Sequence, residues 1–137
     1  MSGIHANAYY QQNQVLAAGR EHVLLLAYDG AIRFCRTARE YMKAGRLYEQ
    51  HTHVIKAQAI LRELITSIDH SVAPELGRRL DSIYHYLYDR LTHANIRDDV
   101  EALNAVIDAL TDLRAAWSEA AVRWRSETPA AAPEPGR

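Results

Sequence analysis

Two amphipathic helices joined by a tight turn are predicted by the stretch LDSIYHYLYDRLTHANIRDDVEAL (Leu80–Leu103). Before the turn, apolar residues recur every three or four positions, at Leu80, Ile83, Leu87, Leu91 and Ala94. This spacing places them on one face of an α-helix. Asn95 can take the left-handed conformation that ends a helix, and Asp98 with Glu101 resembles a capping box that begins the next. The stretch therefore predicts two antiparallel helices that share one core.

Proline and glycine divide the rest of the chain into similar helical blocks. Gly45 supplies a helix stop, and Pro74 suits the first turn of a helix. Helical periodicity then predicts helices over residues 20–44, 47–70, 74–94 and 98–126. Helices of this length joined by short turns predict an all-α fold, an antiparallel up-down four-helix bundle.

Each block carries a stripe of residues expected in the core. The first stripe comprises Leu24, Tyr28, Ala31, Cys35, Ala38 and Met42. The second comprises His51, Val54, Gln58, Leu61, Ile65 and Ile68, with a further row of Ala57, Ile60 and Leu64. The third adds Leu76 to the residues named above, and the fourth comprises Val100, Leu103, Ile107, Leu110, Leu113, Trp117, Ala120 and Trp124. The lone cysteine is expected to act as a small buried apolar residue rather than a nucleophile.

The segments that flank the bundle differ from it in composition. Residues 1–19 include Tyr9, Tyr10 and Val15 among polar residues, which predicts a short N-terminal helical segment that docks on the bundle. Residues 127–137 hold three of the four prolines, which predicts a disordered C-terminal tail. We therefore expect one domain, over residues 20–126, with a docking segment before it and a tail after it.

The composition limits the classes of partner. With 48% apolar and 24% charged residues, the 137-residue chain resembles an ordinary globular domain rather than a disordered one. A formal net charge of -1 gives no strong field to attract nucleic acid. No apolar run approaches the ~20 residues that a membrane-spanning helix needs, and the start lacks the pattern of a signal peptide. We expect a cytoplasmic protein with no nucleic-acid partner and no membrane insertion.

The histidines and serines do not form a recognisable catalytic or metal-binding pattern. The di-iron pattern of helical bundles needs Glu-x-x-His, and no acidic residue stands three positions before His51, His53, His70, His85 or His93. His51 and His53 are two positions apart, so a helix would point them to different sides. We expect no metal, no cofactor and no enzymatic activity.

Two helices carry more apolar and aromatic residues than one buried stripe can hold. Val23 to Ala27 form an unbroken apolar run, and tyrosines stand at positions 84, 86 and 88. At about 100° per residue, three alternate tyrosines spread too widely for all of them to face one core. They either cap the edge of the core with wet hydroxyls or form a groove for a partner helix. Gly30 lies within the apolar helix, where the missing Cβ allows close approach of a neighbouring helix of the bundle or of a bound segment.

An ordered set of motifs resembles the flagellin-specific export chaperone family, FliS. The motifs are LLLAYDGAIRFCRTA (24–38), IKAQAILREL (55–64), YHYLYDRLTHANIRDDVEAL (84–103) and LTDLRAAW (110–117), preceded by AYYQQNQV (8–15). Within them, Asp29 is expected to pair with Arg33, and Arg114 to pack with Trp117 at the edge of the bundle.

The resemblance implies a cytosolic, non-enzymatic chaperone with an antiparallel helical bundle. Its client would be the disordered C-terminal segment of flagellin, which would wrap around the chaperone. The chaperone would prevent premature polymerisation of flagellin and help deliver it to the flagellar export apparatus. The expected client-binding residues are Leu25, Leu26, Ile55, Tyr84, Tyr86, Leu87 and Asn95. The N-terminal segment would cover the client groove through Tyr9, Tyr10 and Val15.

Two other classes of function remain open from the residues themselves. The exposed apolar rows would equally suit a self-associating structural bundle without a client, in which a second copy forms a homodimer. A bundle enzyme or cofactor carrier is the remaining alternative.

Overall fold

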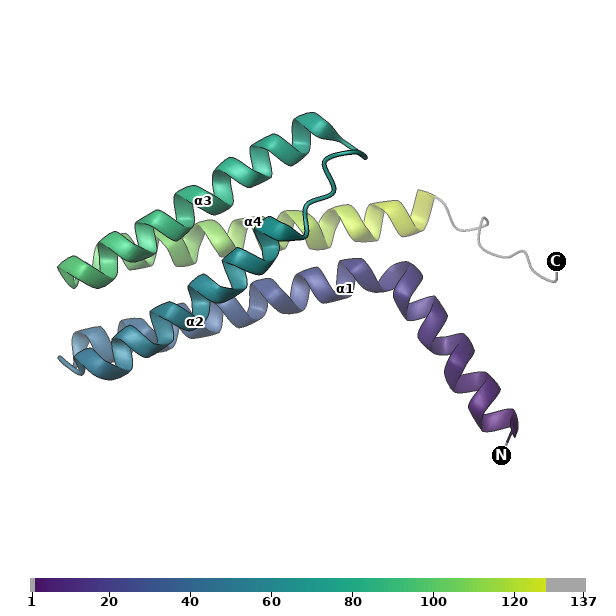
Figure 1. Cartoon of the computed structure of the whole chain (residues 1–137), viewed down its shortest axis with the longest axis horizontal. Helices are drawn as coiled ribbons and strands as arrows, with labels where there is room; N and C mark the ends of the chain where they lie inside the picture. Colours follow the sequence, from purple (N-terminus) through teal and green to yellow (C-terminus); the bar gives the residue numbers. More distant parts are fainter. Residues whose placement is uncertain (1, 128–137) are drawn as a thin grey trace.

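Four α-helices make up the described part of the chain in a computed structural model of the protein (Figure 1). The backbone is described for residues 2–127 and the side chains for residues 20–123 and 126. The helices are α1 (Ser2–Lys43), α2 (Leu47–Thr66), α3 (Pro74–Arg97) and α4 (Val100–Glu127). Residues 2–127 contain no strand, and the predicted all-α fold is confirmed.

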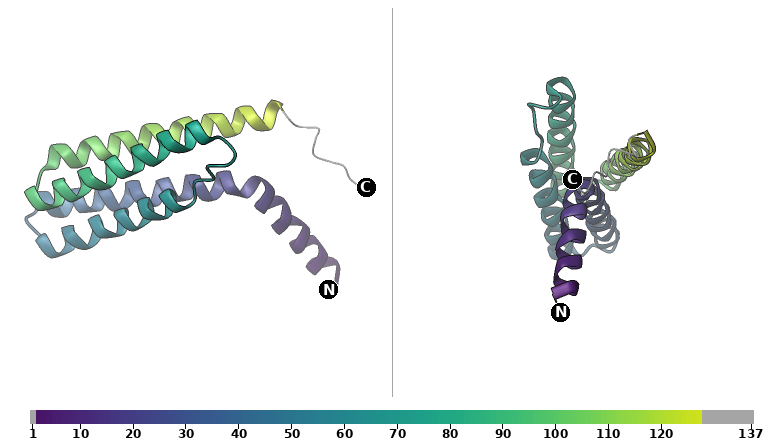
Figure 2. Two further views of the ribbon diagram at one scale, coloured as in Figure 1. Left: turned by 45° about the horizontal axis from the view of Figure 1, so that its top comes forward. Right: turned by 90° about the vertical axis from the view of Figure 1, so that its right-hand side faces the viewer.

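The helices form an antiparallel up-down bundle. Each packs against the next in the sequence, and α4 returns to pack against α1, so the four surround one core (Figures 1 and 2). The two ends of the bundle therefore differ. One holds the α1–α2 and α3–α4 turns, and the other holds the α2–α3 loop beside the later turns of α4.

Helix α1 is longer than the sequence predicts, because residues 2–19 continue it rather than form a separate short helix. The side chains of these residues lie outside the described part of the chain. The contacts expected for Tyr9, Tyr10 and Val15 are therefore not described, nor is the tail over residues 128–137.

The turns use the left-handed conformations that short helix connections need. Gly45 has φ 74° after the end of α1, which confirms the predicted stop. At the α3–α4 turn the left-handed residue is Asp98, with φ 52°, and not Asn95 as expected. The cap of α4 is likewise shifted by one position, because Oδ1 of Asp99 accepts the backbone N–H of Ala102 at 3.0 Å. These backbone contacts lower the pKa of the Asp99 carboxyl.

Among the described side chains, the core follows the predicted stripes on all four helices, while the side chain of Trp124 lies outside the described part. Its fully covered members include Tyr28, Ala31, Cys35, Ala38, Val54, Ala57, Leu61, Leu91, Ala94, Leu103 and Leu110. The thiol of Cys35 has no accessible surface, and burial raises its pKa to about 12. This confirms that it is buried.

Two glutamines of α2 bring polar groups into the core, and the amide nitrogen of each donates to α3 or to the residue that ends it, while Oε1 of Gln50 is buried without a hydrogen-bond partner among the described residues. Gln58 donates through Nε2 to Oγ1 of Thr92 at 2.8 Å and to the carbonyl of Tyr88 at 3.1 Å. Gln50 is 1% exposed and donates to Oδ1 of Asp98 at 2.9 Å. Because a buried amide is costly without partners, these bonds fix the register of α2 against α3.

Three core predictions are wrong, and each error is a rotation of about one position around a helix. On α3, Ile83 is 38% exposed and Tyr84 is buried, the reverse of the expectation. Leu76 is 48% exposed at the start of the same helix. On α2, His51 is exposed, while Gln50 occupies the core position beside it.

Gly30 faces α2 within the bundle. A Cβ built at this position would lie 3.1 Å from Cδ1 of Ile60. The close approach is therefore to a neighbouring helix, in agreement with one of the two interpretations of the sequence. The atom that approaches belongs to a side chain rather than to the backbone.

Candidate functional site

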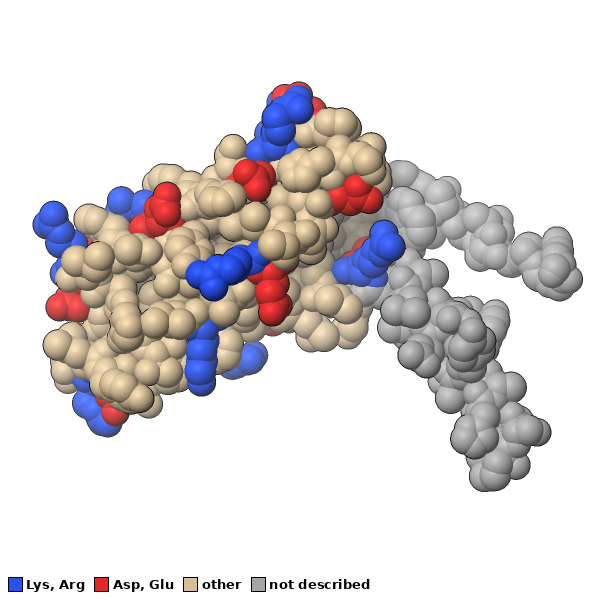
Figure 3. Space-filling model, viewed as in Figure 1, with Lys and Arg blue, Asp and Glu red and all other residues tan. Residues whose placement is uncertain are grey.

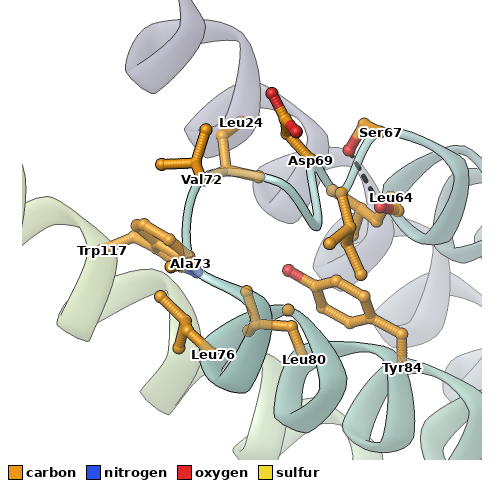
Figure 4. Close-up of a pocket in the computed structure, with 12 residues that line it drawn as sticks. Leu24, Leu64, Ser67, Asp69, Val72, Ala73, Leu76, Leu80, Tyr84 and Trp117 are labelled. Carbon is orange, nitrogen blue, oxygen red and sulfur yellow. Dashed lines mark hydrogen bonds between the residues drawn. The ribbon is translucent and has the colours of Figure 1, made fainter.

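An apolar pocket opens at the end of the bundle that carries the α2–α3 loop. It has a volume of about 210 Å³ and is lined from all four helices and the loop (Figure 4). Leu24 of α1, Leu64 of α2, Leu80 of α3 and Trp117 of α4 form its walls. Such concave apolar sites with a few polar groups are typical of binding sites.

Two aromatic side chains of the pocket wall, Tyr84 and Trp117, form a hydrogen-bonded group with Tyr28 of the core. The hydroxyl oxygens of Tyr28 and Tyr84 lie 2.6 Å apart, and Nε1 of Trp117 donates to the Tyr28 hydroxyl at 3.1 Å. Burial raises the pKa of both tyrosines, so both stay neutral across the physiological range. The group joins α1, α3 and α4 at the base of the pocket, and Figure 4 shows the Tyr84 hydroxyl directed toward its interior.

The outer rim of the pocket consists of exposed aliphatic residues beside a folded loop. Val72 is 78% exposed and Leu76 is 48% exposed. Asp69 holds the loop by accepting the backbone N–H of Ser71 at 3.0 Å and its hydroxyl at 2.6 Å, and these bonds lower the pKa of the Asp69 carboxyl. The pocket thus has a rigid aromatic base and an accessible aliphatic rim.

A second apolar surface covers the face of α2 and α3 near the opposite end of the bundle. Tyr48 is 80% exposed, Ile55 48% and Ile96 72%. In Figure 3, which views this face, mostly uncharged atoms cover its middle, with charged residues at the α3–α4 turn and along its edges. We call these three residues the α2–α3 patch.

Hydrogen bonds between α2 and α3 determine where the α2–α3 patch lies. Nδ2 of Asn95 is 2.8 Å from Nδ1 of His51, and the guanidinium of Arg62 donates to the Tyr88 hydroxyl. Positions 51, 55 and 62 fall on one flank of α2 by helical spacing, so Ile55 lies between the two contacts. The structure therefore brings together two of the expected client-binding residues, Ile55 and Asn95.

The other expected client-binding residues are distributed around the bundle. Leu26 on α1 is 54% exposed and Leu25 is partly buried. Tyr86 is 62% exposed and lies on the flank of α3 that carries His93, which approaches Asp99 at the α3–α4 turn. No single groove contains all of these residues.

Two of the expected client-binding residues need correction. Tyr84 is 2% exposed and Leu87 is 3% exposed, because both point into the core between the helices. Tyr84 reaches the end pocket only as part of its inner wall, and Leu87 does not line that pocket.

The sequence prediction missed several residues of these surfaces. Tyr48 and Ile96 lie off the core stripes and near helix ends, where periodicity gives little information. Val72 lies in a loop, and Leu76 and Trp117 were assigned to the core. The only signal for the first three was a large apolar or aromatic residue outside the buried stripes.

The described residues hold neither a metal-ligand cluster nor a candidate membrane span. Within that part of the chain, no three histidine, cysteine, aspartate or glutamate residues lie close enough to share a metal ion. Likewise, no described helix combines the length and apolar character needed to cross a bilayer.

Comparison with known protein families identifies the family to which this bundle belongs. The family model described as "Flagellar protein FliS" matches residues 3–123, which is most of the chain. The chain belongs to the FliS family. Among curated FliS proteins, the flagellar secretion chaperone of Bacillus subtilis (strain 168) is 34% identical over 111 residues, which cover 81% of this chain and 82% of that protein. The FliS of Salmonella typhimurium is 28% identical over 120 residues, covering 86% and 89%.

The FliS assignment agrees with the fold. A solved structure described as a flagellar chaperone from bacteria superposes with a TM-score of 0.72 at 19% identity, over 86% of this chain and 96% of that one. At this identity the likeness concerns the fold. The family assignment places this FliS protein in flagellum biogenesis, among secretion chaperones.

Proposed function

We propose that this protein is a cytoplasmic flagellar secretion chaperone whose client is the disordered C-terminal segment of flagellin. In this proposal it binds that segment, prevents premature polymerisation and assists delivery to the flagellar export apparatus. It acts through binding alone and not as an enzyme. Family membership supports the role, and the exposed apolar surfaces support the mode of binding.

The observation that carries the proposal is apolar surface left uncovered by the bundle. The large apolar residues that are exposed include Val23, Leu26, Tyr48, Ile55, Val72, Leu76, Ile83, Tyr86 and Ile96. They occupy α1, α2, α3 and the α2–α3 loop, on separate faces. A helical segment that wraps the bundle can reach separate faces, whereas a compact partner would need one continuous patch.

The energetics of such a client suit temporary binding. A disordered segment that folds on binding can bury on the order of 1,000–3,000 Å², but its ordering costs several kcal/mol. A large and specific interface then has only moderate affinity, as release to the export apparatus requires.

The N-terminal residues have a regulatory place in this proposal. We assign Tyr9, Tyr10 and Val15 to a segment that covers part of the apolar surface when the client is absent. Cover of this kind lowers the apparent affinity by the fraction of time that the surface is occupied.

Calorimetry with a peptide from the flagellin C-terminus tests the proposal. We expect submicromolar to micromolar binding and a negative heat-capacity change from apolar burial. Ile55→Asp should weaken binding at least about tenfold, because it places a charge in the α2–α3 patch. Ala116→Asp is the control, since it adds the same charge at an exposed position of α4 that carries no large apolar side chain. No detectable heat with the unmodified chain would overturn the proposal.

A self-associating bundle without a client is the alternative that the same surfaces allow. Light scattering with and without flagellin separates the two. A homodimer that persists at low concentration and does not take up flagellin would favour the alternative, whereas a one-to-one complex would favour the chaperone.

A further inference from the structure

A second cleft lies between α1 and α4, and it is basic rather than apolar. It has a volume of about 450 Å³ and is lined by Asp29, Ile32, Arg33, Arg36, Thr37, Thr111 and Arg114. None of these residues lines the apolar end pocket. Three guanidinium groups and one carboxylate leave the lining with a local excess of two positive charges. The chain as a whole has a net charge of -1, so this excess is local.

The single carboxylate of the cleft is already engaged. Oδ1 of Asp29 accepts Nε of Arg114 at 2.7 Å, and Oδ2 accepts Nη2 at 3.3 Å. Among the described residues, no carboxylate lies within ion-pair distance of Arg33 or Arg36, and both are exposed. Two guanidinium groups one helical turn apart on α1 therefore line the cleft without an ion-pair partner among the described residues, and that of Arg33 also lies 5.4 Å from the centre of the Phe34 ring.

The other groups of the cleft suit a peptide that carries carboxylates. Ile32 is 7% exposed and forms an apolar floor between Thr37 on α1 and Thr111 on α4, whose hydroxyl donates to the carbonyl of Ile107 at 2.8 Å. Arginine pairs with carboxylates through two parallel hydrogen bonds, which gives both strength and direction. Positions three apart on a helix match carboxylates one turn apart on a helical ligand.

Charges beside the cleft limit the length of the ligand. Asp108 and Asp112 are exposed on α4, within four residues of Thr111. They would repel an anionic polymer that continued along α4, such as a nucleic acid. A short acidic run fits between these carboxylates and the arginines of α1.

We propose that the α1–α4 cleft docks a short acidic segment of a partner protein through Arg33 and Arg36. The site is independent of the apolar client surfaces, because it lies on other residues and uses charge instead of apolar burial. Binding there would be strong at low salt and weak at high salt, since both arginines are exposed to solvent.

The proposal can be tested by titrating the full-length ¹⁵N-labelled chain with an end-capped hexaglutamate peptide at low ionic strength. We expect shifts of the Thr37 and Thr111 amide signals, and a decrease in affinity of about tenfold or more in R33E/R36E. The matched control is R79E/R123E, which changes the net charge equally at exposed positions outside the cleft. If R33E/R36E loses helicity, R33Q/R36Q replaces it.

Three results would overturn the proposal. They are an absence of shifts at Thr37 and Thr111, an equal loss of affinity in the control variant, and binding of inorganic phosphate with the same affinity at the same residues. The last would indicate a free-anion site instead of a docking site. Binding of the flagellin peptide in R33E/R36E is measured alongside, so failure of this proposal and failure of the client proposal remain distinguishable.

Discussion

Asp29 on α1 and Arg114 on α4 form a two-point ion pair across the bundle, with Nε 2.7 Å from Oδ1 and Nη2 3.3 Å from Oδ2. The sequence predicts a different partner for each residue, because Arg33 follows Asp29 by one turn and Trp117 follows Arg114 by three positions. In the fold, Trp117 instead turns inward to donate to Tyr28. Asp29 and Arg114 are 85 positions apart in the sequence, and their ion pair connects the first helix to the last.

The stability contributed by this pair should depend on acid pH. The hydrogen bond from Arg114 lowers the pKa of Asp29 below its ordinary value of 3.8. A lowered folded-state pKa gives stability that is present above the unfolded pKa and is lost as the pH falls through the folded pKa. Asp29→Asn should therefore lower the urea midpoint slightly at pH 7, since both side chains are more than a third exposed. The difference from the unmodified chain should shrink as the pH falls below 3.8, and a difference that stays constant would indicate a packing effect.

The buried tyrosine pair should contribute the amount typical of one hydrogen bond. Tyr84→Phe keeps the ring but leaves the Tyr28 hydroxyl with Trp117 as its only remaining partner in this group. We expect a loss of about 1 kcal/mol in the free energy of unfolding, measured by urea denaturation with an unchanged slope. Tyr86→Phe is the control, because Tyr86 is 62% exposed and its hydroxyl is wet. An equal loss in both variants would show that the buried bond contributes nothing specific.

The sequence predicted the architecture well because the core stripes are long and regular. Cys35, Leu61 and Leu91 all lie where a 3.6-residue period places them. Periodicity failed where two neighbouring residues competed for one position. Tyr84 is buried in preference to Ile83 because its hydroxyl finds Tyr28 on a helix 56 positions away, and no local pattern shows that partner.

The candidate surfaces were harder to predict than the core. Whether an exposed residue belongs to a binding face depends on the flank of the helix that it occupies and on what packs beside it. Asn95 lies beside the flank of α2 that carries Ile55 only because hydrogen bonds from Asn95 to His51 and from Arg62 to Tyr88 align α2 with α3. The α1–α4 cleft was not predicted, since the sequence suggested local partners for Arg33 and Arg114 and no local pattern shows that α1 and α4 bring them to one cleft.

Replacing Gly30 should distinguish backbone entropy from close packing. Gly30→Ala gains about 1 kcal/mol of helix propensity but places a methyl group 3.1 Å from Cδ1 of Ile60. Ile60 is only partly buried, so its flexible end can move, and we expect a net stabilisation smaller than the full gain. In an Ile60→Val background, which removes Cδ1, the same change should recover the full gain. A loss of stability in both backgrounds would contradict this account.

Paired aspartate substitutions at Leu26 and Tyr84 should separate client binding from folding. Tyr84→Asp places a carboxylate in the core beside Tyr28 and also removes a large aromatic ring, so we expect a loss of more than about 3 kcal/mol in the free energy of unfolding and a largely unfolded chain.

Leu26→Asp replaces a side chain that is 54% exposed, so the thermal midpoint should change little. Under the proposed function, its affinity for the flagellin peptide should nevertheless fall severalfold. Circular dichroism checks the first outcome and calorimetry the second. If Leu26→Asp binds the peptide as well as the unmodified chain does, the client does not reach the outer face of α1.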